Sequence, residues 1–206
     1  MLFQGQVVNA VPGVRATGNP NVMQLMLGEI GVSEVMGRYA ALAQAGLLFS
    51  ARAALQATSL AGTALVGLQV WNRTANKNLH LLKCGGNVVA TSATQTGVAL
   101  AFGAAQTTAP TGQTAATSVI NNFIGGAAPG ALALAAGTFA VTPVAQYDLL
   151  HNTASVAASG EDQGYLIDFE GSVIIPPNGF MAFVALGTAG AAASNNHWAM
   201  WAELPV

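Results

Sequence analysis

The amino-acid sequence predicts an all-β protein, an antiparallel sandwich or barrel preceded by an extended arm and one short helix. Three observations support this fold class. From Thr63 onward, short apolar runs alternate with turn-forming Gly, Pro, Asn and Ser, with no helical segments between them. Residues 1–32 are apolar but repeatedly broken by proline, glycine and asparagine. Only Ser33–Ala45 carries an apolar stripe at helical spacing.

The clearest local element is Gly171–Leu186, in which two apolar runs flank Pro176-Pro177-Asn178-Gly179. Proline supplies the fixed φ of early turn positions, and Asn-Gly tolerates the positive φ that the exit of a turn requires. Because proline lacks the N–H that a central ladder needs, the first run has to end at Ile175. We therefore expect a β-hairpin with a four-residue connection.

The N-terminal 32 residues are expected to form an irregular arm that lies along a neighbouring surface. Its breakers exclude a long regular element, yet its apolar side chains are of the kind that proteins rarely leave in water. The side chains that we expect to dock on a partner, one of them on the helix, are Val7, Val8, Val11, Val22, Met23, Leu25, Met26, Leu27 and Tyr39.

The helix over Ser33–Ala45 has signals at both ends. Ser33 can cap the first turn, Glu34 suits the positive end of the helix dipole, and Gly46 stands where a terminating glycine is expected. A short strand follows over residues 46–51. The chain is therefore expected to divide into an arm with its helix, residues 1–58, and a β domain, residues 59–206.

The β domain is expected to contain roughly eight to ten short strands. The segments are 63–71, 79–84, 87–92 after a bulge, 97–102, 118–124, 138–141, 144–150, 165–169, the two runs around the Pro-Pro turn, and 197–204. Residues 104–117 and 125–137, rich in Ala, Gly and Pro, are expected to be long loops. Such a count without alternating helices favours a sandwich or barrel over a βαβ fold.

The composition excludes several functions. Charged residues make up 7% of the chain, with 6 basic and 8 acidic side chains, so no basic stripe is available to neutralise phosphates and no nucleic-acid partner is expected. So little charge would hardly keep a monomer dispersed, which favours a surface covered by other subunits. The alternative is a soluble monomer with an Ala- and Thr-rich surface.

Neither a membrane partner nor a disulfide is expected. The most apolar window, residues 127–141, is broken by Pro129 and two glycines and is shorter than the roughly 20 residues of a spanning helix. The single cysteine, Cys84, excludes an intrachain disulfide, which fits assembly in a reducing cytoplasm.

No catalytic, metal or cofactor site emerges from the reactive side chains. The three histidines occupy separate predicted strands or strand ends without metal-ligand spacing, and ordinary edge or loop roles are expected for His80, His151 and His197. Cys84 fits a buried inert thiol. Trp198 and Trp201 lie an odd number of residues apart and so face opposite sides of the last strand, and the sequence leaves open which one is exposed.

The densest acidic patch comprises Glu161, Asp162, Asp168 and Glu170. A solvated or inter-subunit acidic face is the favoured interpretation. A calcium site remains an alternative because glycines flank the first pair, although calcium needs six to eight oxygen ligands. A glycosidase acid–base pair is the third option, without further support from the chain.

Four stretches resemble the small jelly-roll structural proteins of tailed bacteriophage particles, namely head decoration or cement proteins and some tail or fibre knobs. They read GRYAALAQAGLLFSA, TALVGLQVWNRTANKNLHLLK, YLIDFEGSVIIPPNGFMAFVALG and HWAMWAELP. The likeness runs from about residue 33 to the end. It implies a jelly roll, commonly a homotrimer, bound to a virion surface, and it carries over no catalytic residues.

Composition and resemblance together predict a non-enzymatic virion protein without cofactors. We expect a capsid decoration, or cement, protein that stabilises a phage head by binding between subunits of the major capsid protein. The alternative is a tail or fibre knob that binds a host receptor or glycan through loops such as 104–117, 125–137 and 187–196. A small sandwich enzyme is a third, weaker hypothesis.

Overall fold

The computed structural model describes residues 39–90, 95–151, 163–187 and 194–206. The chain divides into two compact units, Met1–Ala45 and Gly46–Val206. In the first unit, residues 39–44 are helical and the Ala45 N–H donates to the Ala41 carbonyl at 3.0 Å, which confirms the C-terminal part of the predicted helix. Tyr39 is half-buried there. Residues 33–38 and the docking side chains predicted on the arm lie outside the described residues.

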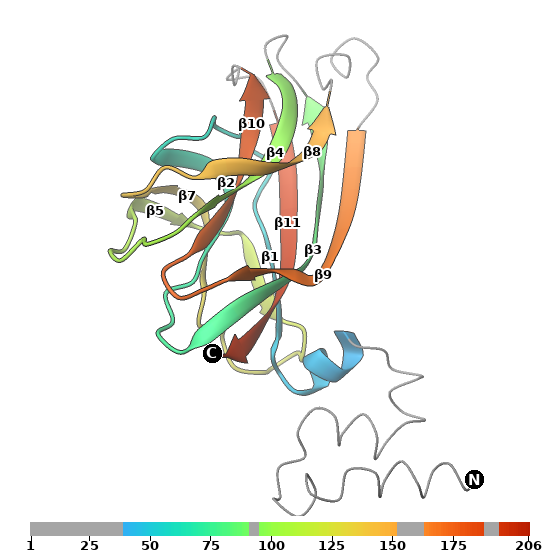
Figure 1. Cartoon of the computed structure of the whole chain (residues 1–206). Helices are drawn as coiled ribbons and strands as arrows, with labels where there is room; N and C mark the ends of the chain where they lie inside the picture. Colours follow the sequence, from blue (N-terminus) through green and yellow to red (C-terminus); the bar gives the residue numbers. More distant parts are fainter. Residues whose placement is uncertain (1–38, 91–94, 152–162, 188–193) are drawn as a thin grey trace, which may run out of the picture. The chain divides into compact units, whose positions relative to one another are not determined.

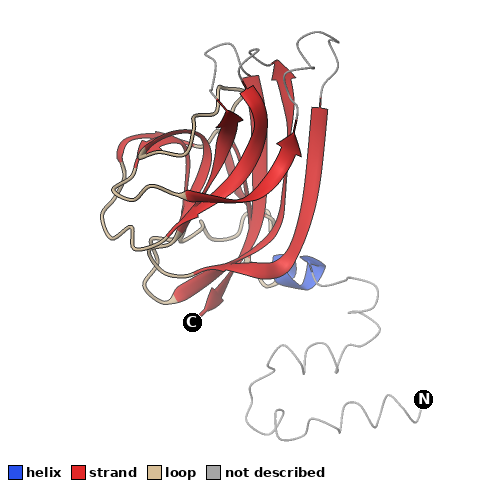
Figure 2. Cartoon of the chain, turned by 45° about the horizontal axis from the view of Figure 1, so that its top comes forward, coloured by secondary structure: helices blue, strands red, loops and turns tan. Residues whose placement is uncertain are grey.

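The second unit is a sandwich of two antiparallel sheets, as predicted (Figures 1 and 2). One sheet has the strand order β6-β1-β11-β3-β9 and the other β5-β7-β2-β10-β4-β8. The strands are β1 (Leu48–Arg52), β2 (Ala64–Trp71), β3 (Lys77–Ala90), β4 (Gln95–Gly103), β5 (Thr111–Ala115), β6 (Ser118–Asn121), β7 (Leu132–Thr138), β8 (Val144–His151), β9 (Gln163–Ile175), β10 (Phe180–Gly187) and β11 (Ser194–Pro205).

The strands alternate between the sheets along most of the chain. β1, β3, β9 and β11 belong to the five-stranded sheet, whereas β2, β4, β8 and β10 belong to the six-stranded sheet. Between β4 and β8, the chain adds β6 beside β1 and adds β7 and β5 beside β2. Since β1 pairs with β11, the sandwich includes residues ahead of the expected boundary at residue 59.

The predicted hairpin over Gly171–Leu186 is wrong. β9 and β10 lie in opposite sheets, so the Pro-Pro-Asn-Gly segment is an arch that crosses the core. Two of its backbone hydrogen bonds join it to Asn72, in the segment that links β2 to β3 and also passes from one sheet to the other. The backbone N–H groups of Asn72 and Asn178 donate to the carbonyls of Gly179 and Asn72, each at 2.8 Å. The local turn chemistry was identified correctly, since Asn178 has φ 63°, but it does not decide the sheet that the second run joins.

Two of the predicted loops contain strands. β5 lies within residues 104–117, and β7 lies largely within 125–137. β7 reads LALAAGT, a sequence with low strand propensity, yet Ala133 and Ala135 are buried against the core and the strand pairs with β2. Pairing and burial therefore override local propensity in this segment. The strand expected over 138–141 is wrong, because β7 already ends at Thr138 and residues 139–141 form no strand.

The two sheets enclose one apolar core, and a second apolar cluster covers the opposite face of the six-stranded sheet. The inner core includes Trp201, Phe183 and Leu100. In the second cluster, Phe139 stacks on Phe180 with ring centroids 4.3 Å apart, next to Ala99, Ala101, Leu134, Ala182 and Val184. The six-stranded sheet is thus covered on both faces. None of the helices that the structure describes is long and apolar enough to cross a membrane.

Candidate functional site

The outer face of the five-stranded sheet carries a row of side chains that the strand register brings together. Along β1 and β11, Ala51 and Ala199 are buried towards the core, so Arg52 and Trp198 lie on the opposite side. Cross-strand pairing then aligns one residue from each strand, in the order Ser118, Arg52, Trp198, Gly85 and Leu166. These five positions are far apart in sequence, and only the sheet makes them neighbours.

Gly85 allows the Trp198 ring to lie on the sheet. A Cβ atom at Gly85 would stand 2.9 Å from each of Cε2, Cζ2 and Nε1 of the Trp198 indole, so the ring face covers this glycine. Trp198 is half-buried, whereas Trp201 is 1% exposed and stacks on Phe49 in the core. The prediction that the two tryptophans face opposite sides is confirmed, and Trp198 is the outer one.

Two adjoining recesses flank Trp198 and Arg52, and together they form what we call the outer groove. The larger has a volume of about 610 Å³ and is lined by Arg52, Gly86, Asn87, Gly164, Tyr165, Leu166, Asn196 and Trp198. The smaller, of about 240 Å³, is lined by Ser50, Ala51, Arg52, Ser118, Ile120, Trp198 and Met200. Volumes of this order suit a small ligand or a short segment of a polymer.

The polar groups of the outer groove are amides and hydroxyls around the positive charge of Arg52. The Arg52 Nε donates to the Asn196 Oδ1 at 2.8 Å, which holds the guanidinium beside the indole. Among the described residues that line the two recesses, Arg52 is the one that carries a charge. Further along β3 and β9, Lys83 and Asp168 neutralise each other at 3.2 Å. The described lining of the groove therefore carries one positive charge.

Beneath the larger recess, a buried chain of hydrogen bonds fixes Tyr165. The Tyr165 hydroxyl lies 2.8 Å from Nδ1 of His197, and Nε2 of His197 lies 3.0 Å from the Thr58 hydroxyl. The imidazole stacks on Phe183 with centroids 4.6 Å apart. In either tautomer, a neutral imidazole supplies one donor and one acceptor to these hydroxyls. The chain thus pins β9 to β11 below the outer groove.

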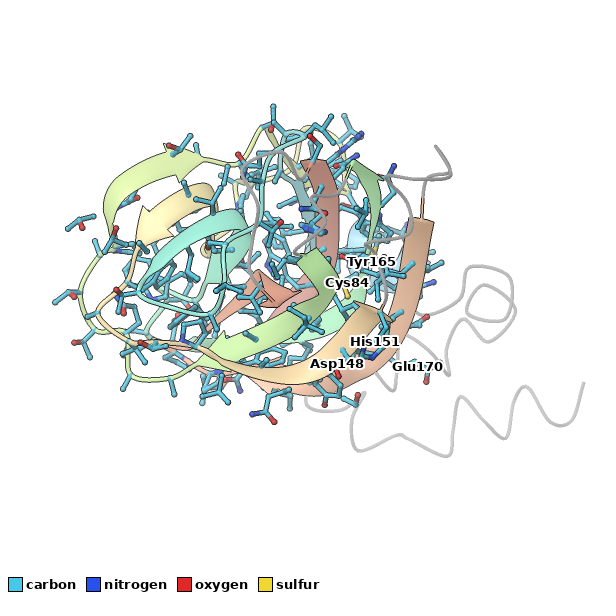
Figure 3. The ribbon with its side chains drawn as sticks, turned by 90° about the horizontal axis from the view of Figure 1, so that it is seen from above. Cys84, Asp148, His151, Tyr165 and Glu170 are labelled. Carbon is cyan, nitrogen blue, oxygen red and sulfur yellow. The ribbon has the colours of Figure 1, made fainter. Side chains whose placement is uncertain are left out.

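Burial controls the protonation states of His197, Tyr165 and the nearby Cys84. Removal from water lowers the pKa of His197 to about 3 and raises the pKa of the nearby Cys84 thiol to about 12. Burial, and then the adjacent Cys84, also hold the pKa of Tyr165 well above its ordinary value. All three groups are therefore neutral at pH 7. Figure 3 shows Cys84 and Tyr165 among the side chains of β3 and β9.

The expectation of an inert Cys84 is confirmed, but the edge or loop role expected for His197 is wrong, because its side chain is in the core. His151 is exposed, and its Nε2 lies 3.6 Å from an Asp148 carboxylate oxygen on the same strand (Figure 3). His80 is half-buried on β3. Within the described residues, no three His, Cys, Asp or Glu side chains are grouped so that they could hold a metal ion.

The acidic patch is only partly described. Glu161 and Asp162 lie outside the described residues. Asp168 pairs with Lys83, and its Oδ1 also accepts the Glu170 backbone N–H at 2.9 Å. Glu170 has φ 52° and Gly171 has φ 78°, so the strand bends sharply between the two halves of β9. The carboxylate of Asp168 therefore serves this bend and a cross-strand ion pair.

The sequence offered little sign of Arg52, Asn87 and Asn196. Each is a common polar residue on a strand, and its significance depends on the neighbours that pairing supplies. The one signal is the Gly85-Gly86 pair, which falls between the strand segments expected over 79–84 and 87–92. In the structure, β3 runs through both glycines, and its register shift falls at Leu82 instead.

Comparison of the chain with protein-family models, with curated protein sequences and with solved structures gives no match.

Proposed function

We propose that this chain is a non-enzymatic virion protein that decorates the head of a tailed bacteriophage. In this proposal it acts as cement, bound between subunits of the major capsid protein, and it stabilises the particle by burying surface across their junctions. The observation that carries the proposal is a surface with very few charges and several large apolar side chains in water.

Most of the exposed apolar side chains lie on edge strands and loops of the sandwich. Ile120, Phe123 and Ile124 lie together at the end of β6, and the side chain of Ile124 is 81% exposed. Leu166 on β9 is 65% exposed and Val144 on β8 is 60% exposed. Covering such a side chain with a partner contributes a favourable free energy of roughly 25 cal/mol per Å² of apolar surface removed from water. A surface of this kind favours association with other subunits over a monomer in solution.

The strand order supports a jelly roll for the sandwich. Two groups of four strands, β1-β11-β3-β9 and β2-β10-β4-β8, interleave along the chain. This is the order expected when two Greek keys are wound into a double sheet, an architecture found in viral capsid and lectin domains. The inserted strands β5, β6 and β7 extend both sheets on the same side, and they would enlarge the surface available to neighbours. A homotrimer is part of the proposal.

The arm provides a direct test. Chains in which Val22, Met23 and Leu25–Leu27 are replaced by serine should lose occupancy on purified heads at least tenfold, because their apolar docking surface is gone. Replacement of Asn19, Asn21 and Gln24 by serine is the matched control and should leave occupancy unchanged. Occupancy would be measured by sedimentation of particles with bound chain. Equal occupancy of both variants and the natural chain would overturn docking by the arm.

A second function, that of a tail or fibre knob binding a host receptor or glycan, is favoured by the outer groove. The loops first expected to bind the receptor are less suitable, since two of them contain β5 and β7. An adsorption assay separates the two functions. A knob should bind host cells as purified protein, whereas a cement protein should bind heads and leave cells unlabelled.

A further inference from the structure

We propose that the outer groove binds a saccharide that carries a carboxylate, stacked on Trp198 and held by Arg52. The proposal depends on the geometry of the groove, and it does not require that the protein lies on the head or on the tail of a phage. It can therefore fail or succeed independently of the cement function.

The indole of Trp198 is suited to be the stacking surface. One face of the ring lies over Gly85, and the same side chain lines both recesses, so the rest of the ring borders the groove. A sugar ring has an apolar face of C–H groups that packs well on a flat aromatic ring. Because Trp198 is wedged against the sheet, it loses little side-chain freedom when a ligand binds.

The groups beside Trp198 match the polar edge of a sugar. Asn87 and Asn196 each present an amide with donors and an acceptor, as hydroxyl groups require. Leu166, at the far side of the larger recess, offers an apolar contact. Gly164 adds no side chain to the larger recess. Gly86 is required on the core side of the sheet, because a Cβ atom there would meet the Asn196 carbonyl and Nδ1 of His197.

Arg52 decides the charge of the ligand. Its guanidinium is exposed and hydrogen-bonded through Nε to Asn196, and none of the described residues that line the two recesses is acidic. Among the described residues, the two Nη groups make no hydrogen bond, so both remain available to a ligand. A planar guanidinium binds a carboxylate through paired hydrogen bonds. A single positive charge is too little for a polyphosphate or nucleic acid.

The test uses trigalacturonic acid and its methyl ester, in which a methyl group on each carboxyl group removes the negative charge. Each would be titrated into the full chain, with binding followed by tryptophan fluorescence and by calorimetry. The acid should bind saturably and about tenfold more tightly than the ester, and this preference should weaken with added salt.

Two variants locate the binding. Arg52→Gln should reduce affinity for the acid to that for the ester while leaving the ester unaffected, and Trp198→Leu should abolish binding of both. Arg73→Gln, an exposed arginine outside the groove, is the matched control and should change nothing. Circular dichroism and thermal unfolding would show that each variant is folded.

Several results would overturn the site. These are equal affinity for acid and ester, an Arg52→Gln variant that binds like the natural chain, or the absence of binding at millimolar ligand. The site would also be overturned if the natural chain formed an oligomer that binds no saccharide and the Trp198→Leu variant were a monomer. The groove would then be an interface between copies of this chain.

Discussion

At the scale of single residues, His197 ties the stability of the sandwich to pH. The folded chain holds the imidazole with a pKa of about 3, against an ordinary value of 6.5. Between these values the unfolded chain binds a proton that the folded chain does not, so stability decreases as the pH falls below 6.5. The full contribution of the neutral histidine is present above pH 6.5, and it is lost progressively down to about pH 3.

We therefore expect the free energy of unfolding to decrease by about 2 kcal/mol between pH 7.5 and pH 5, a range in which the carboxylates hardly titrate. Urea denaturation at the two pH values measures this change. The variant His197→Phe, although less stable, should lose the pH dependence, whereas His151→Asn, at an exposed site, should keep it. A natural chain equally stable at both pH values would contradict the burial of a neutral histidine.

Gly85 offers a second prediction at this scale. In Gly85→Ala, the new Cβ would lie 2.9 Å from the Trp198 indole, so the ring has to move away from the sheet. We expect a loss of about 1–3 kcal/mol in stability and a shift in tryptophan emission as the indole gains water. Gly164→Ala is the control, because its Cβ would meet only the Gly86 carbonyl at 3.6 Å. Identical emission spectra for both variants would contradict the stacking.

At the scale of elements, Asn72 holds the arches that carry the chain between sheets. Its side-chain amide donates to the carbonyls of Lys77 and Ile175 at 2.8 and 3.0 Å, and its Oδ1 accepts from the Thr74 hydroxyl. It therefore connects the β2–β3 crossing with the end of β9. These hydrogen bonds hold the arch between β9 and β10, which do not pair with each other as the two strands of a hairpin would.

Asn72→Ala should cost about 3 kcal/mol, because buried backbone carbonyls lose their donors. The control is Asn76→Ala in the same turn, where the side chain is exposed and a change within about 0.5 kcal/mol is expected. Chemical denaturation of both variants measures the difference. Equal stability of the two would show that the arches do not depend on Asn72.

The inserted strands have an anchor of their own. The buried Glu203 carboxylate on β11 accepts the backbone N–H groups of Gly130 and Ala131, each at 3.0 Å, and pairs with Lys77 at 3.1 Å. It therefore fixes the start of β7 to the last strand of the opposite sheet. The two hydrogen bonds from Gly130 and Ala131 help to explain how an Ala- and Gly-rich segment adopts one conformation.

At the scale of the whole molecule, the unit Gly46–Val206 has its own core. A chain lacking residues 1–45 should therefore fold, with a midpoint of thermal unfolding within a few degrees of that of the full chain. Circular dichroism measures the midpoint, and analytical ultracentrifugation would compare the oligomeric states. A truncated chain without cooperative unfolding would show that the sandwich depends on the N-terminal segment.

Much of the fold could be predicted from the sequence. β2, β4, β8 and β11 lie close to their predicted positions, because alternating apolar residues and turn formers act over a few neighbours. β7 escaped prediction, since its alanines form a strand only when β2 and β5 pair with it. The jelly roll, the virion role and the docking arm stay predictions.

The sequence by itself determined the positions of most strands, the turn at Pro176–Gly179 and the opposite orientations of Trp198 and Trp201. Each depends on backbone torsions or on the two-residue repeat of a strand, which are local properties. Only the tertiary structure decided that this turn is an arch between the two sheets and that Trp198 lies over Gly85 beside Arg52. Sheet membership depends on burial and pairing between distant segments, and Arg52 meets Asn196 across 144 positions of sequence.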